Sequence, residues 1–100
     1  MPKFTWDETK NRSNEIKHGL KFEEACLIFD GQVFTVLDER RDYGEDRQLS
    51  IGSVRGLVVV LVVHTARAGS IRIISARLAN RRERKQYDEY LRQATGRARG

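Results

Sequence analysis

The chain has 100 residues, which is enough for one domain with a single hydrophobic core. A charged fraction of 33% beside 39% hydrophobic residues is typical of a folded domain rather than a disordered chain. The longest apolar run, residues 57–63, is too short to span a bilayer, and the N-terminus has no apolar signal region. The single cysteine excludes an intramolecular disulfide. These features predict a cytoplasmic protein without a membrane segment.

The formal net charge of +5 is distributed unevenly along the chain. Residues 1–65 carry nine Lys and Arg against eleven Asp and Glu, a net charge of −2, whereas residues 66–100 carry ten against three, a net charge of +7. Nine of those ten cations are arginine, whose planar fork of donors matches phosphate oxygens. This asymmetry predicts a polyanion partner, although a solvated basic helix with a disordered tail would have the same composition.

The first predicted elements are a short strand at residues 3–6 and a polar helix at residues 8–18. Asp7 is a good N-cap for this helix, and Gly19 suits the left-handed position after its last turn. The helix carries few apolar side chains, so in a monomer it has little apolar reason to dock.

A second, short helix is predicted over residues 22–29 because apolar side chains recur at helical spacing. The stripe consists of Phe22, Ala25, Cys26 and Phe29. This pattern predicts that Cys26 is a core residue rather than a reactive thiol.

Four further strands are predicted at residues 33–37, 47–54, 57–63 and 71–77. The last three are joined by short turns, which indicates an antiparallel meander. The run 57–63 is apolar on both faces and therefore predicts a central strand covered on both sides. The acidic loop 38–46 is interpreted as solvent-exposed rather than as a Mg²⁺ site.

A final helix is predicted over residues 81–93, with Asn80 as N-cap and Glu83 completing a capping box. Residues 95–100 are expected to be a frayed basic tail. The element order gives an α+β domain over residues 1–94, with two N-terminal helices, an antiparallel sheet and one C-terminal helix.

Common catalytic motifs are absent from the sequence: it has no phosphate-binding loop, no nucleophile elbow and no His-Glu-x-x-His. His18 and His64 are far apart and the chain has one cysteine, so no metal site and no cofactor are expected.

Residues that suit RNA chemistry gather around the last hairpin and the helix after it. Histidine can transfer protons near neutral pH, arginines can stabilise a charged phosphorane, and tyrosine can stack on a base. The set is His64, Thr65 and Arg67 on one strand, Arg72, Ser75 and Arg77 on the next, and Arg81, Arg82, Arg84, Lys85 and Tyr87 on the helix. His64, Ser75 and Tyr87 also have ordinary structural interpretations as core or strand residues.

The two strand arginines raise a geometric question. On a regular strand Ser75 and Arg77 share a face with Ile71 and Ile73, whereas Arg72 faces the other way. A bulge, or a bend near Arg77, is needed to bring both arginines to one site.

Two separated segments resemble the BrnT family of toxins. The first is Phe4-Thr-Trp-Asp-Glu-Thr-Lys-Asn-Arg-Ser-Asn14 with Lys17-His-Gly-Leu-Lys-Phe-Glu-Glu-Ala25. The second includes His64-Thr-Ala-Arg67, Ile71-Arg-Ile-Ile-Ser-Ala-Arg77 and Ala79-Asn-Arg-Arg-Glu-Arg-Lys-Gln-Tyr87. The resemblance spans about residues 4–90.

The resemblance implies a RelE-like fold and a type II toxin–antitoxin toxin, a metal-independent endoribonuclease that arrests growth. It also implies a BrnA-like antitoxin as partner, operator DNA bound through the complex, and a toxin homodimer within a hetero-oligomer. An antitoxin helix is expected to cover part of the polar first helix and of strand 57–63.

The family pattern transfers to Arg67, Arg72, Ser75, Arg77, Arg84 and Tyr87. We expect Arg67 and Arg77 to be catalytic, with His64 and Tyr87 as candidates for proton transfer or base contact. Members of the family often have tyrosine in place of His64. The residues expected to bind the RNA backbone are Arg72, Ser75, Arg81, Arg82, Arg84 and Lys85. The alternative is a non-catalytic nucleic-acid-binding or co-repressor module.

Overall fold

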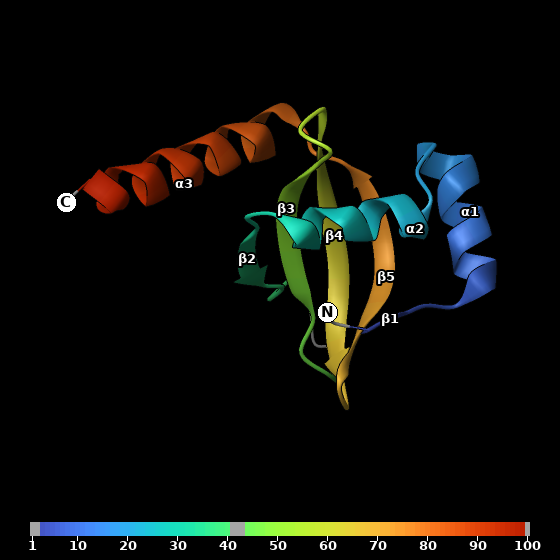
Figure 1. Ribbon diagram of the computed structural model, residues 1–100. Helices are drawn as coiled ribbons and strands as arrows, with labels where there is room; N and C mark the ends of the chain where they lie inside the picture. Colours follow the sequence, from blue (N-terminus) through green and yellow to red (C-terminus); the bar gives the residue numbers. More distant parts are fainter. Residues whose placement is uncertain (1–2, 41–43, 100) are drawn as a thin grey trace.

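The computed structural model describes residues 3–40 and 44–99. The elements are β1 (Lys3–Thr5), α1 (Glu8–His18), α2 (Phe22–Ala25), the 3₁₀ helix η1 (Cys26–Asp30), β2 (Phe34–Leu37), β3 (Gln48–Val54), β4 (Val58–Arg67), β5 (Ser70–Leu78) and α3 (Arg81–Arg99). The predicted α+β class, with two N-terminal helices and one C-terminal helix around a sheet, is confirmed (Figure 1).

The five strands form one sheet in the order β1-β5-β4-β3-β2. β3, β4 and β5 form the predicted antiparallel meander, and β2 pairs antiparallel with β3 at its other side. β1 lies at the edge and runs parallel to β5, so the sheet is mixed rather than antiparallel throughout. β1 is connected to the rest of the sheet through α1 and α2, and this long connection imposes no hairpin on it (Figure 1).

β4 is the central strand, and its side chains alternate between two apolar clusters. Val60 and Val62 pack with the buried side chains of α2 and η1, on what we call the helix face. Leu61 and Val63 pack with Tyr87 of α3, on what we call the α3 face. The predicted two-sided cover of this strand is confirmed, and the chain itself supplies it.

α1 docks through hydrogen bonds instead of apolar contacts. Asn14 is 7% exposed; its Nδ2 donates to the carbonyls of Leu20 at 2.9 Å and Ala76 at 2.7 Å, and its Oδ1 accepts from the Ala76 amide at 3.1 Å. Asn14 thereby pairs with the edge of β5 as a neighbouring strand would. Asn11 likewise accepts from the backbone amide of Phe22 at 2.8 Å. Two buried asparagines therefore anchor α1, although this helix has few apolar side chains to bury.

The second predicted helix changes its pitch after Ala25. The chain continues as η1, whose turn contains three residues, so Ile28 rather than Cys26 follows Ala25 into the core. Cys26 is half-buried, and burial raises the pKa of its thiol. Ile28 packs onto β3 where glycine leaves room: a Cβ on Gly52 would lie 2.7 Å from the Cβ of Ile28.

Two element boundaries also differ from the predictions. The β3–β4 turn uses Arg55 and Gly56 at φ angles of 56° and 70°, which leaves Leu57 outside the strand and exposed. α3 is capped by Asn80 as predicted but continues past Gln93 to Arg99, because that stretch has no proline and mostly good helix formers. Its C-terminal half extends beyond β2 (Figure 1). In the part of the chain that the structure describes, no helix is long and apolar enough to cross a membrane.

Candidate functional site

A bulge in β5 decides which side chains share the α3 face. Val63 of β4 pairs with Ser75, but the next residue, His64, pairs with Ile73. Ile74 is therefore the extra residue of β5 at this point. The alternation of side chains along β5 shifts by one residue across the bulge.

The bulge brings both strand arginines to the same face. Arg72 precedes Ile73, which is buried on the helix face, so Arg72 lies on the α3 face. Ser75 and Arg77 pair with residues of β4 that belong to the α3-face cluster. The bulge that the sequence analysis required is therefore present, and Arg72, Ser75 and Arg77 line one side of β5.

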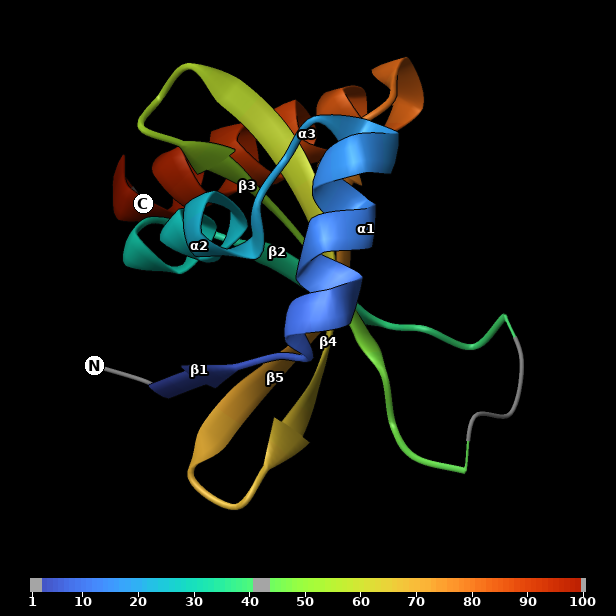
Figure 2. The ribbon, with the colours of Figure 1, turned by 90° about the vertical axis from the view of Figure 1, so that its right-hand side faces the viewer.

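Arg67 and Arg77 lie at opposite ends of this face. Arg67 pairs with Ser70 beside the β4–β5 turn, which is the end of the sheet away from α3 (Figure 2). Arg77 pairs with Leu61 near the start of α3. Along β4 the Arg67–Ser70 pair lies six positions from the Leu61–Arg77 pair, a distance of roughly 20 Å. Arg67 and Arg77 are therefore suited to different phosphates of one polyanionic ligand, and Arg72 lies between the two arginines.

Arg67 forms an exposed ion pair with the loop before β3. Its Nη2 lies 3.0 Å from Oε2 of Glu45, and the two side chains are 52% and 32% exposed. An exposed pair of this kind stabilises a fold by less than about 1 kcal/mol, so a phosphate can replace the carboxylate at little cost.

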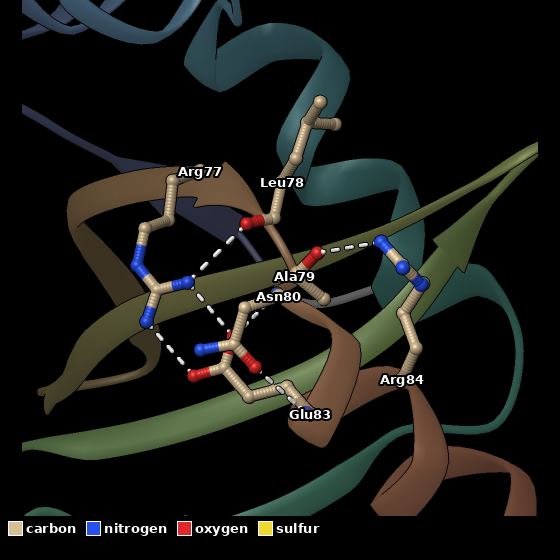
Figure 3. A network of polar contacts seen from close by, with 6 residues as sticks. All are labelled: Arg77, Leu78, Ala79, Asn80, Glu83 and Arg84. Carbon is tan, nitrogen blue, oxygen red and sulfur yellow. Dashed lines mark hydrogen bonds and ion pairs between the residues drawn. The ribbon is translucent and has the colours of Figure 1, made fainter.

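Arg77 is held at the start of α3 by a bidentate ion pair (Figure 3). Its Nη1 and Nη2 donate to Oε1 and Oε2 of Glu83, both at 2.8 Å, and Nη1 also donates to the Leu78 carbonyl at 3.2 Å. Glu83 is at the same time the acid of the predicted capping box. Its Oε1 accepts from the Asn80 amide at 2.9 Å, and its own amide donates to the Asn80 side chain at 2.8 Å.

The ion pair shifts both partners toward their charged forms. The hydrogen bonds from Arg77 lower the pKa of Glu83, and those to Glu83 raise the pKa of Arg77. The charge of Arg40, from the loop after β2, also acts on both groups. Arg40 itself pairs with Asp38, whose side chain is fully buried, at 2.8 Å. The α3-side end of the face is therefore an alternating set of arginines and carboxylates.

Arg72 and Ser75 occupy the middle of the α3 face and are half-buried. Among the residues that the structure describes, neither the Arg72 guanidinium nor the Ser75 hydroxyl has a hydrogen-bond or ion-pair partner. Arg72 is thus a strand arginine that no carboxylate of the described residues neutralises. Sequence reasoning assigned it only to backbone binding, because the bulge that places it beside Ser75 has no sequence signature.

His64 is separated from the arginines by the sheet. It lies on the helix face, is 4% exposed, and its Nε2 is 2.7 Å from the Ser50 hydroxyl, which in turn is 2.7 Å from that of Thr35. The Phe29 ring packs edge-on against the imidazole at 5.2 Å. Burial lowers the pKa of His64 to about 4. A buried neutral imidazole on the opposite face does not reach RNA bound over the arginines.

The low pKa of His64 makes the fold sensitive to acid. Below the unfolded-state pKa near 6.5 the unfolded chain binds a proton that the folded one excludes down to about pH 4. The free energy of unfolding should therefore fall by about 3 kcal/mol as the pH drops through this window. Urea unfolding of wild type and His64→Gln at each pH isolates this contribution; equal pH dependence in both proteins would contradict it.

Tyr87 is also a core residue. It is 5% exposed, packs in the α3-face cluster, and its hydroxyl donates to the Gln32 carbonyl at 2.7 Å. Burial is the main cause that raises the pKa of Tyr87. Its body fills the interface between α3 and the sheet, so the core interpretation that the sequence left open fits this geometry.

Four basic residues in the first half of α3 have exposed side chains. Arg84 donates to the Ala79 carbonyl at 3.2 Å and so also ties the helix to the end of β5. Arg82 and Lys85 line an open hollow of about 460 Å³ with Phe34 and Tyr90. Arg81 is exposed in the first turn. Arg84 thus lies near the end of β5, whereas Arg82 and Lys85 lie toward Phe34 of β2.

Two residues of this neighbourhood were not among the predicted site residues. Arg40 lies in a loop whose position the sequence does not specify. Glu83 was recognised as a capping residue, but its ion pair with Arg77 depends on the turn from β5 into α3. Within residues 3–40 and 44–99, no cluster of three or more His, Cys, Asp or Glu side chains is arranged to hold a metal ion.

A five-stranded sheet with an arginine-lined face defines a small α+β protein suited to a polyanionic ligand. A family model described as the ribonuclease toxin, BrnT, of type II toxin–antitoxin systems matches residues 6–83. The chain therefore belongs to the BrnT family, which confirms the resemblance seen in the sequence.

A solved structure supports this assignment. The Brucella abortus ribonuclease toxin BrnT is 27% identical in sequence, with a TM-score of 0.60 over 81% of this chain and 100% of that one. A search of curated proteins finds no match.

Proposed function

We propose that the protein is a metal-independent RNA endonuclease whose active surface is the α3 face. The observation that carries the proposal is the bulge of β5, which places Arg72, Ser75 and Arg77 on one side of the strand. Membership of the ribonuclease toxin family supports RNA as the polyanion. The cytoplasm, where messenger and ribosomal RNA are accessible, is its place of action.

The arrangement divides the arginines by role. The scissile phosphate lies over Ser75, between Arg72 and Arg77, and Arg67 contacts a neighbouring phosphate toward the β4–β5 turn. The 2′-hydroxyl gives its proton to water and attacks phosphorus, the bond to the 5′-oxygen breaks to leave a 2′,3′-cyclic phosphate, and the 5′-oxygen takes a proton from water. The two arginines stabilise the extra negative charge of the phosphorane, where fixed donors contribute most. Arg81, Arg82, Arg84 and Lys85 hold the flanking backbone.

The family also supports a protein partner. A type II toxin is paired with an antitoxin, and we propose a BrnA-like protein that covers the α3 face and blocks RNA. In this proposal the complex contains a toxin homodimer and binds operator DNA through the antitoxin. Release of the toxin then arrests growth.

Incubation of the purified protein with RNA in excess EDTA tests the enzymatic activity. We expect discrete cleavage products at the same rate with EDTA as with added Mg²⁺, because arginine side chains rather than a metal stabilise the phosphorane. Cleavage that stops with EDTA and returns with Mg²⁺ would contradict metal independence.

A non-catalytic RNA-binding or co-repressor module is the second candidate. The specific observation in its favour is that the two predicted proton-transfer residues, His64 and Tyr87, are both buried and hydrogen-bonded. In the same RNA assay this candidate gives a salt-sensitive mobility shift without cleavage products.

A further inference from the structure

Glu83 leaves one edge of the Arg77 guanidinium open. A guanidinium has five N–H donors, and the contacts to Glu83 and to the Leu78 carbonyl use three of them, two on Nη1 and one on Nη2. The remaining two, on Nε and Nη2, lie on the same edge. Figure 3 shows that this edge points away from Asn80 and Glu83. Paired donors on one edge are the geometry that binds two oxygens of a phosphate.

We propose that Glu83 is a positioning residue, which fixes Arg77 so that its open Nε/Nη2 edge receives an RNA phosphate. The inference rests on the proposed function and deepens it by adding a residue that touches no RNA. A free arginine side chain samples many rotamers, whereas the bidentate pair holds this one in a single orientation before RNA binds.

The capping box makes this positioning rigid. Glu83 is bonded to Asn80 through both its backbone and its side chain, and Asn80 begins α3 directly after β5. The carboxylate that orients Arg77 is therefore fixed to the joint between strand and helix. Its negative charge also offsets the repulsion that the charge of Arg40 exerts on Arg77.

Glu83→Gln separates the two tasks of this side chain. Glutamine serves in a capping box as well as glutamate, so the start of α3 remains capped. The variant loses the charge and the second acceptor oxygen that hold Arg77. The matched control is Glu89→Gln, the same change on α3 in an exposed pair with Arg92, with side chains 60% and 70% exposed. Both variants raise the net charge by one unit, so the control accounts for stronger general attraction to RNA.

The kinetic test compares these variants on the wild-type and Arg77→Ala backgrounds. We expect Glu83→Gln to lower kcat for RNA cleavage about 10-fold with little change in KM, and Glu89→Gln to leave both constants unchanged. On the Arg77→Ala background Glu83→Gln should have no further effect, because it acts through Arg77. A wild-type rate for Glu83→Gln, or an equal loss on both backgrounds, overturns the proposal.

A second readout does not depend on cleavage. The probe is a 2′-O-methyl RNA oligonucleotide, which lacks the attacking hydroxyl, and the signal is the Arg77 Nε–H resonance in NMR spectra. We expect this resonance to shift on binding in wild type and not in Glu83→Gln. A shift in both proteins, or in neither, overturns the proposal. A shift in wild type alone, from a protein that does not cut RNA, supports the positioning role and refutes the proposed nuclease.

Discussion

Arg72→Ala is expected to slow RNA cleavage at least about 100-fold, the usual cost of removing one preorganised donor to a developing negative charge. Arg72 lies beside Ser75 in the middle of the α3 face, and no described carboxylate neutralises it. The substitution removes no side-chain hydrogen bond or ion pair that the structure describes, so the fold should be retained. Single-turnover cleavage of a labelled RNA measures the loss.

Two matched arginine-to-alanine variants test whether the loss of cleavage depends on the position of Arg72 on the α3 face. Arg12→Ala removes the same charge from α1, which docks along the edge of β5 and not on the α3 face, and should cleave at the wild-type rate. Arg67→Ala, at the far end of the face, should mainly raise KM and reduce the salt dependence of binding, since it loses one phosphate contact. If Arg72→Ala cleaves as fast as Arg12→Ala, the centre of the face is not the catalytic position.

Asn14→Leu is expected to lower the free energy of unfolding by about 3–4 kcal/mol. The leucine has a similar volume but leaves the Ala76 amide and the carbonyls of Ala76 and Leu20 without partners in a buried place. Each such loss costs about 1–3 kcal/mol. For a domain of this size the melting temperature should fall by about 15 °C or more. Thermal unfolding followed by circular dichroism measures the change.

Neighbouring substitutions separate hydrogen bonding from helix propensity and shape. Ser13→Ala, exposed on the same helix, should change stability by less than about 0.5 kcal/mol. Asn14→Asp keeps the acceptor for the Ala76 amide but turns a carboxylate oxygen toward two carbonyls, so it should destabilise although its shape is nearly the same. A melting temperature near the wild-type value for Asn14→Leu would show that α1 is held by other contacts.

Local chemistry made much of the fold predictable. The bounds of α1 follow from Asp7, whose side chain accepts from the amides of Thr9 and Lys10, and from Gly19 at a φ of 69°. The start of α3 follows from the reciprocal bonds of Asn80 and Glu83. These signals involve residues at most four apart or one backbone angle, so the sequence contains them completely.

The parts that the sequence did not predict depend on contacts between distant residues. The docking of α1 joins Asn14 to Ala76, which is 62 positions away. The change from helix to η1 after Ala25 follows from packing Ile28 onto Gly52 of β3. The side of the sheet on which His64 lies could not be predicted for a similar reason: the facing of a strand residue is set by register, and no local pattern fixes the register of a strand that is apolar on both sides.

The extra residue in β5 also constrains how relatives of this chain can differ. Arg72 and Arg77 are five positions apart, an odd number that separates them on a regular strand and unites them only across an insertion. Deletion of Ile74 would make β5 regular, so one of the two arginines would point into the apolar layer although both would remain in the sequence. In relatives, an odd spacing between the two arginines should therefore occur with a bulge, and an even spacing with a regular strand. A homologue with an even spacing and a regular β5 would present the same pair of cations by a different route.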